Sequence, residues 1–258
     1  MIPWLVLERI MTLRLNNITD DERLDVWRRV IKRIANEQGR QAWSHYMFRL
    51  LRVVYIKNDK LSAEGGFILD WMAQNYVDTA LMLVRRELDQ QAGAENLHNL
   101  LFDIIAHPTV LTRARYKAGW DQDEFLYDDI RDRAFDKFNP KRVDGNPSAD
   151  YIDPELVKAD LDQVIADAEN LRKYAERTRA HRTPQRNISQ TDFTFAELHK
   201  TIADVRNTVS KYHSLITLGV ISNWEPTPQF NPIAPFMYPW VEDATSVMAA
   251  VDENPEAH

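Results

Sequence analysis

Apolar residues recur at intervals of three and four along most of this chain, and this spacing restricts its fold more than any other feature. An α-helix brings such residues onto one face, whereas a half-buried strand needs strict alternation. The clearest run lies in residues 153–181 and comprises Val157, Leu161, Val164, Ala168, Leu171 and Ala175. The 258 residues also include only seven glycines, which disfavours an architecture of many strands and turns. We therefore predict an all-α protein, a bundle of helices.

The same spacing predicts helices over 20–55, 67–88, 94–107, 110–117, 124–138, 153–181 and 196–218. Thr19 or Asp20 caps the first of these, and Gly39 is expected to break or kink it. Beyond Gly39 a buried face is expected to continue through Trp43, Tyr46, Met47, Leu50, Leu51 and Val54. Asp153 suits the N-cap of the helix that starts near residue 154, and Pro184 ends that helix near residue 181.

Proline and glycine near residues 139–149 indicate a linker between an N-terminal helical portion, 1–140, and a C-terminal pair of helices, 150–220. The pair is predicted to form a hairpin. The sequence leaves open whether these are separate domains or one. The tail, 221–258, places five prolines among five aromatic residues between Trp224 and Trp240. We predict that it lies extended, either as a strap across the core or as a docking surface for a partner.

Charge is strongly segregated within the first helix of that pair. Residues 148–170 carry seven acids against the single Lys158, and a basic island follows at residues 172–186, although the whole chain has a net charge of −7. The cations of the island are Arg172, Lys173, Arg177, Arg179, Arg182 and Arg186. One interpretation is that this gradient only complements the helix dipole. The other is that the island binds the phosphates of RNA or of another phosphate-bearing ligand.

A histidine within the island suggests chemistry as well as binding. Arg177 and His181 are four residues apart and would share one helix face near its end. A neutral imidazole can accept the proton of a ribose 2′-hydroxyl, and a guanidinium can stabilise the charge that builds on the phosphorane. The pattern therefore suggests cleavage of RNA.

The chain resembles the HEPN superfamily, in particular its AbiU-type abortive-infection branch. The resemblance is carried by residues 171–182, LRKYAERTRAHR, by 195–199, FAELH, by 85–89, RRELD, and by the tail rich in Trp and Pro. It implies a helical bundle that forms a homodimer and acts as a metal-independent endoribonuclease in a toxin or phage-defence system. An antitoxin or another defence protein would be a partner.

The family's catalytic histidine carries over to His181, and our leading hypothesis assigns roles to the other charged residues of the island. His181 would be the general base, Arg177 and Arg179 would stabilise the phosphorane, and Glu176 would orient them. Arg172, Lys173, Arg182 and Arg186 would hold the RNA backbone. In the family four to six residues separate the arginine from the histidine, whereas Arg177 leaves three and Arg172 leaves eight. A catalytically inactive HEPN-like module, which binds RNA, a nucleotide or a protein, is therefore the alternative.

Weaker candidates lie at the end of the predicted helix 67–88. Arg85, Arg86 and Asp89 belong to the resemblance, but an ordinary ion pair between Arg85 and Asp89 would also explain their spacing.

Several classes of function lack support. The absence of cysteine excludes disulfides and thiolate metal sites, and the dispersed histidines show no metal-binding spacing, so we predict no metal and no cofactor. Phosphate-binding loops and nucleophile elbows are also missing. The apolar start, 1–7, is too short for a signal peptide, and no run approaches a membrane span. We expect a cytoplasmic protein.

Overall fold

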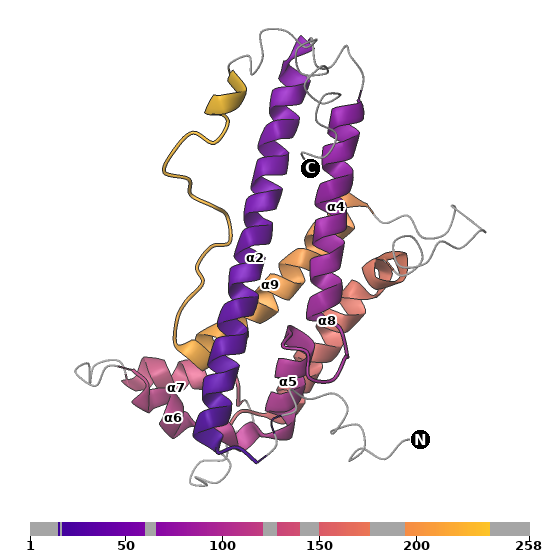
Figure 1. Ribbon diagram of the computed structural model, residues 1–258. Helices are drawn as coiled ribbons and strands as arrows, with labels where there is room; N and C mark the ends of the chain where they lie inside the picture. The colour runs from indigo at the N-terminus through magenta and orange to yellow at the C-terminus, as the bar shows by residue number, and fades with distance from the viewer. Residues whose placement is uncertain are drawn as a thin grey trace. The chain divides into compact units, whose positions relative to one another are not determined.

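The computed structural model describes residues 15, 17–59, 66–120, 128–139, 150–175 and 194–237, and in these ranges its regular structure is helical (Figure 1). The elements are α2 (Asp20–Lys57), α4 (Phe67–Glu87), α5 (Leu97–Ala106), η1 (Pro108–Val110), α6 (Arg113–Ala118), α7 (Asp128–Asp136), α8 (Pro154–Ala175), α9 (Phe195–Thr217) and η6 (Ala234–Met237). No strand forms among the described residues, where β pairing is limited to one isolated bridge between Thr112 and Tyr151. The all-α prediction is confirmed.

The first helix, α2, starts where the sequence indicates but does not stop at Gly39. Thr19 and Glu22 form a capping box: the Thr19 Oγ1 accepts from the Glu22 backbone N–H at 3.3 Å, and the Glu22 carboxylate accepts from the Thr19 N–H at 2.8 Å. The predicted break at Gly39 is wrong, because α2 continues to Lys57. One interior glycine costs a helix only about 1 kcal/mol relative to alanine, which the hydrogen bonds on either side outweigh.

The chain forms two compact units. The first comprises Met1–Gln41 and Val77–Trp224, and the second comprises Ala42–Tyr76 and Glu225–His258. The first unit thus takes in both sides of the predicted linker, and within it α5 packs against α8. The predicted division into 1–140, 150–220 and 221–258 remains a prediction.

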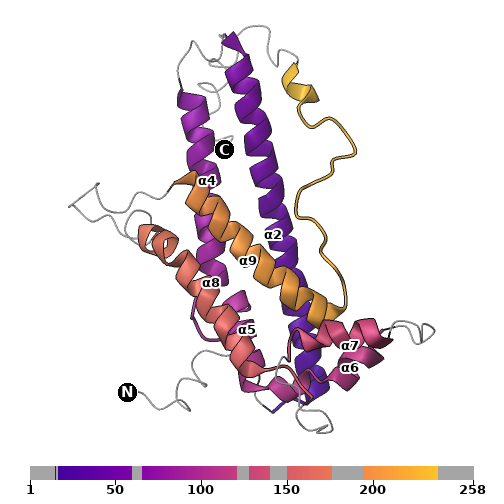
Figure 2. The same cartoon turned by 180° about the vertical axis from the view of Figure 1, so that it is seen from behind.

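The core of the first unit is built from the apolar faces that the sequence indicates. All six apolar residues named above for residues 153–181 are buried in α8. The α9 helix buries the matching set Leu198, Ile202, Val205, Val209, Tyr212 and Leu215. The Tyr212 hydroxyl donates to Asp160 at 2.7 Å, and the Thr201 hydroxyl donates to the Asp167 carbonyl at 3.1 Å. These pairs run in opposite directions along the two helices, so α8 and α9 pack antiparallel (Figure 2).

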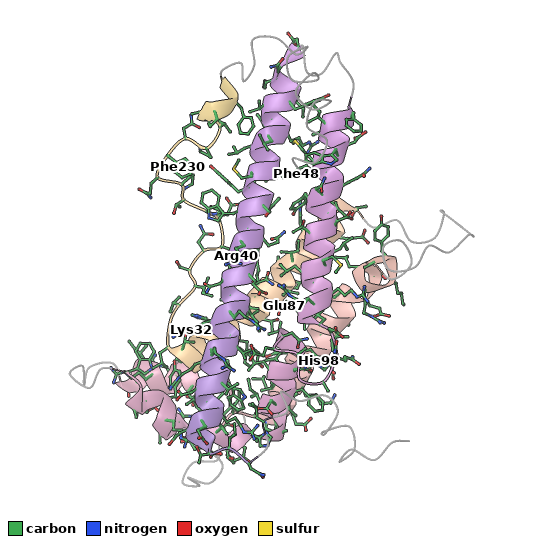
Figure 3. The ribbon with its side chains drawn as sticks, in the orientation of Figure 1. Lys32, Arg40, Phe48, Glu87, His98 and Phe230 are labelled. Atoms are coloured by element: carbon green, nitrogen blue, oxygen red, sulfur yellow. The ribbon has the colours of Figure 1, made fainter. Side chains whose placement is uncertain are left out.

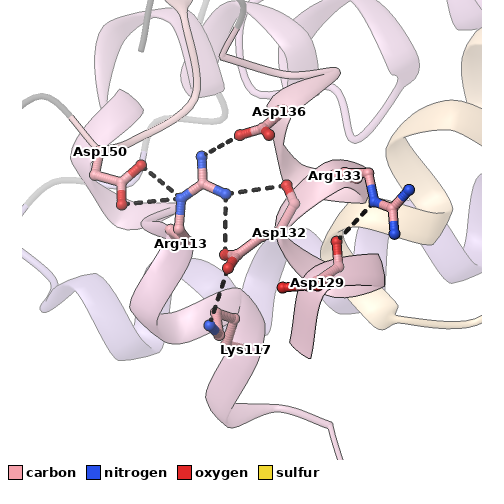
Figure 4. Close-up of polar contacts among 7 residues, drawn as sticks. All are labelled: Arg113, Lys117, Asp129, Asp132, Arg133, Asp136 and Asp150. Atoms are coloured by element: carbon pink, nitrogen blue, oxygen red, sulfur yellow. Dashed lines mark hydrogen bonds and ion pairs between the residues drawn. The ribbon is translucent and has the colours of Figure 1, made fainter. Parts of the chain in front are cut away.

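One arginine joins three segments of the first unit (Figure 4). The buried Arg113, from α6, donates to Asp150 at 2.8 and 2.9 Å, to Asp132 at 3.1 Å and to Asp136 at 2.6 Å. Asp132 and Asp136 lie on α7, while Asp150 is the first described residue after the segment 140–149. Lys117 also contacts Asp132, at 3.3 Å. This cluster fixes α7 and the start of the 150–175 segment against α6.

The second unit buries less apolar surface than the sequence suggests. Tyr76 stacks on Phe48 at a ring distance of 4.8 Å and on His45 at 5.5 Å. Trp43, which the sequence places on a buried face, is 38% exposed, and the other five residues predicted for that face are only half-buried. The prediction of a continuous buried face beyond Gly39 is therefore wrong. Regular spacing reveals which residues share a face, but not whether a partner covers it.

The described part of the tail begins on α9. The Trp224 indole N–H donates to the Ser210 hydroxyl at 3.1 Å, and the Arg206 guanidinium lies 5.8 Å from the centre of the Trp224 ring. In the second unit, Glu225 pairs with Arg49 at 3.2 Å and Phe230 is 67% exposed (Figure 3). Residues 238–258 lie outside the described part of the chain, so the strap remains a prediction.

Candidate functional site

The structure describes the start of the basic island. Glu176, Arg177, Arg179, His181, Arg182 and Arg186 lie outside the described residues. Arg172 and Lys173 form the exposed last turn of α8. Both contact one carboxylate, since Glu169 lies 3.0 Å from Arg172 and 3.2 Å from Lys173. Hydrogen bonds from these two cations lower the pKa of Glu169, so this turn presents two positive charges against one negative charge.

A pocket of about 330 Å³ lies between the last turns of α4 and the C-terminal half of α8. Its apolar lining comprises Leu81, Val84, Leu88, Ile165, Ala168 and Leu171. Its polar lining comprises Arg85, Asp89, Gln90, Glu169 and Arg172. Folding thus brings two of the weaker candidates together with the first cation of the island. The sequence does not indicate this pocket, because no local pattern specifies that α4 packs beside α8.

The two arginines at the end of α4 differ in their surroundings. Arg86 forms an ion pair with Glu37 and lies 3.6 Å from the Glu87 carboxylate. Arg85 is exposed and makes no ion pair with any residue that the structure describes. The ion pair suggested for Arg85 and Asp89 is absent because α4 ends at Glu87, and the Asp89 carboxylate instead accepts from the Gln91 backbone N–H at 3.1 Å. Arg85 is therefore available to a ligand in the pocket.

Two buried asparagines hold the turn that carries Asp89 and Gln90. The Asn96 amide donates to the carbonyls of Arg86 at 3.0 Å and Asp89 at 2.7 Å, while its oxygen caps α5 by accepting from the Asn99 N–H at 2.9 Å. Asn99 donates to two further carbonyls of the same turn. The sequence did not single out either asparagine, although asparagine before an apolar helix is a favoured N-cap. These bonds fix the rim of the pocket.

A buried acid lies directly behind this rim. Glu87 is 1% exposed and accepts a hydrogen bond from the Leu97 N–H at 3.2 Å (Figure 3). Burial raises its pKa from 4.5 to about 7; Arg86, the Leu97 N–H and Arg33 oppose the shift, and Glu37 adds to it. Glu87 therefore changes its charge near neutral pH, one residue from the pocket lining.

The Glu87→Gln variant should reveal this titration. A carboxyl with a higher pKa in the folded than in the unfolded protein makes stability fall as pH rises between the two values, here from 4.5 to about 7. Removing the ionisable group should therefore raise the free energy of unfolding by about 3 kcal/mol at pH 8 relative to wild type, and by little at pH 4.5. Urea unfolding at both pH values measures the difference. The variant Glu95→Gln serves as control. An equal stability difference between Glu87→Gln and wild type at both pH values would contradict the raised pKa of Glu87.

The described residues hold neither a metal-binding cluster nor a helix that could cross a membrane. No three His, Asp or Glu side chains there converge as ligands for a metal ion. His98, for example, is buried against Phe102 and faces Asn99, and burial lowers its pKa. No helix in this part of the chain combines the length and the apolar character that a membrane crossing requires.

Comparisons with known proteins add little. No family model matches the chain, and no solved structure matches it. The chain is similar to the Immunoglobulin A1 protease autotransporter of Haemophilus influenzae, with 25% identity over 184 residues. The similarity covers 65% of this chain but only 12% of the autotransporter. It is too distant and too partial to show a family, and it carries no activity over to this chain.

Proposed function

We propose that this chain binds RNA at the C-terminal end of α8 and cleaves it without a metal ion, as an HEPN-like endoribonuclease of a toxin or phage-defence system. The observation that supports the proposal most is the grouping of Arg85 with Arg172 in one pocket. Lys173 adds a third cation in the same turn as Arg172. Arg85, Arg172 and Lys173 thus lie at the end of α8, which leads into the segment with His181, although the protein has a net charge of −7.

The chemistry proposed for this segment requires no cofactor. His181 accepts the proton of a ribose 2′-hydroxyl, and the oxygen attacks the adjacent phosphorus. Arg177 and Arg179 stabilise the phosphorane, with Glu176 orienting them. The bond from phosphorus to the 5′-oxygen breaks, this oxygen takes a proton from water and leaves as a hydroxyl, and a 2′,3′-cyclic phosphate remains. Arg172, Lys173, Arg182 and Arg186 hold the backbone. The antiparallel pair of α8 and α9 suits this proposal, because two-fold pairing of such hairpins in a cytoplasmic homodimer would join two helix ends in one cleft.

The test of catalysis is cleavage of mixed cellular RNA by purified protein in EDTA. We expect wild type to release fragments that end in 2′,3′-cyclic phosphate and the His181→Ala variant to release none. The His107→Gln variant is the matched control, since His107 is a partly exposed histidine on the C-cap of α5. Cleavage by His181→Ala at the wild-type rate would exclude His181 as the base.

The rival function, an inactive module that binds RNA, is favoured by the irregular arginine spacing. Binding is tested separately with the double variant Arg172→Glu/Lys173→Glu. Its affinity for RNA should fall at least about tenfold at 0.15 M salt, and the slope of log affinity against log salt should decrease by about 2, because two phosphate contacts are lost.

The matched control for binding is Lys158→Glu/Lys200→Glu. This double variant makes the same change in net charge on α8 and α9, at lysines that pair with Asp162 and Asp204. Equal losses in both double variants would indicate a general charge effect and contradict a binding site at the end of α8. RNA binding without cleavage in wild type would select the inactive module.

A further inference from the structure

We propose that the pocket between α4 and α8 holds one unpaired nucleotide of the bound RNA, with its base on the apolar floor and its phosphate on Arg85. This inference rests on the proposed binding of RNA and adds a preference for single strands. It follows from three features of this pocket: an apolar floor, a cation without an ion pair to any described residue, and polar groups at the rim.

The dimensions of the pocket suit a single nucleotide. Binding pockets for small molecules begin at volumes of about 300 Å³, so about 330 Å³ accommodates one base with its sugar and no second stacked base. The floor is contributed by Leu81 and Val84 from α4, by Leu88 directly after it, and by Ile165, Ala168 and Leu171 from α8. A flat aromatic base would cover this apolar surface and remove it from water. A base within a duplex cannot enter until it is unpaired and unstacked.

The charges of the rim place the phosphate at Arg85. Arg172 is compensated by Glu169, at 3.0 Å, whereas Arg85 has no described ion-pair partner. The Glu169 carboxylate beside Arg172 repels a phosphate, so the phosphate is expected at Arg85. Charge-assisted bonds from a guanidinium fit a phosphate well, since two N–H groups can donate to two oxygens.

Two other groups of the rim, Asp89 and Gln90, suit the edge of a base. Asp89 is an exposed acceptor, held by the Asn96 bond to its carbonyl, and Gln90 offers both a donor and an acceptor. A carboxylate accepts well from the amino groups of adenine, cytosine and guanine. Uracil has no amino group, and its two carbonyl oxygens face the same charge unfavourably. Among mononucleotides, uridine monophosphate should therefore bind most weakly.

The test uses the full-length protein and two variants that alter the pocket in different ways. Ile165→Trp fills the pocket from the half-buried Ile165, and Arg85→Ala removes the proposed phosphate contact. Ile130→Trp, at a 54% exposed position of α7, is the control for the first. Arg29→Ala is the control for Arg85→Ala, because Arg29 is exposed. Its ion-pair partner, Glu95, remains paired with Arg33 when Arg29 is removed. Thermal unfolding of each variant confirms that the fold persists.

Fluorescence anisotropy then compares a single-stranded 12-nucleotide RNA with a blunt duplex of the same sequence. We expect wild type to prefer the single strand, and Ile165→Trp and Arg85→Ala each to weaken that binding by about tenfold, with both controls near wild type. Adenosine monophosphate should compete with the single strand for wild type but not for Ile165→Trp. Equal affinity for both RNAs, or unchanged binding by Ile165→Trp, would overturn the inference.

The same measurements separate this inference from the proposed function. If Arg172→Glu/Lys173→Glu loses RNA binding while Ile165→Trp retains it, RNA binds at the end of α8 and the pocket proposal is wrong. If adenosine monophosphate occupies the pocket without displacing RNA, the pocket takes a free nucleotide, which also overturns the proposal for an RNA base. If neither set of variants loses RNA binding, both the RNA site at the end of α8 and the pocket proposal are contradicted.

Discussion

Replacing Asp103 with alanine is expected to lower the free energy of unfolding by about 4 kcal/mol, the range found when one partner of a buried ion pair is removed. Asp103 lies on α5 with a side chain that is 1% exposed. Its two carboxylate oxygens accept from one Arg23 nitrogen at 2.8 Å each, and one also accepts from the Trp27 indole N–H at 2.7 Å. The alanine variant would leave the buried Arg23 guanidinium without its carboxylate, with only the Leu15 carbonyl as acceptor at 2.9 Å, and the buried Trp27 N–H without its acceptor.

Urea unfolding followed by circular dichroism measures this loss. The double variant Arg23→Met/Asp103→Leu is the informative comparison, because replacing a whole buried pair with apolar residues is often nearly neutral. It should therefore recover most of the stability lost by Asp103→Ala. A loss below about 1 kcal/mol in the single variant would contradict the role assigned to this pair.

Replacing Arg113 with methionine should lower the free energy of unfolding by about 3 kcal/mol. This loss is slightly smaller than the one expected for Asp103→Ala, because the acidic partners of Arg113 are partly exposed. The variant leaves three carboxylates, Asp132, Asp136 and Asp150, close together without their shared cation. Burial tends to lower the pKa of Arg113, but its hydrogen bonds to these acids outweigh burial and raise the pKa, so the guanidinium stays charged.

The effect of Arg113→Met should depend on pH in a defined direction. Burial raises the pKa of Asp132, but hydrogen bonds from Arg113 and Lys117 outweigh this and lower it below its ordinary 3.8. A lowered carboxyl pKa stabilises the fold above the unfolded value, and this contribution is lost as pH falls through the folded value. The difference between wild type and variant should therefore be largest near pH 7 and shrink below about pH 4.

The control for this second prediction is Arg133→Met. Arg133 lies on the same helix as Asp132, but it is exposed and donates only to the Asp129 carbonyl in Figure 4, at 3.2 Å. A surface change of this kind should alter stability by no more than about 0.5 kcal/mol. Equal losses in Arg113→Met and Arg133→Met would contradict a special role for the Arg113 cluster.

The sequence by itself determined the helices and the faces that they bury. Spacing of three and four selected the six buried residues of α8, because helical geometry alone places them on one side. Local signals also marked the ends: Thr19 and Glu22 cap α2, and Asp153 accepts from the Glu155 N–H at 3.0 Å at the start of α8. The sequence also singled out Arg172 and Lys173 as the exposed start of a basic island.

Tertiary structure decided which of these faces meet and therefore where a ligand could bind. Arg85 and Arg172 are far apart in sequence, and only the packing of α4 and α8 beside one another places both at one pocket. The same packing leaves Arg85 without a described ion-pair partner while Arg86 pairs with Glu37, although the two are neighbours in the chain. In the second unit, Trp43 is exposed although its spacing places it on an apolar face. Local spacing fixes the direction of a side chain relative to its own helix, but the identity of its neighbour depends on contacts between distant segments.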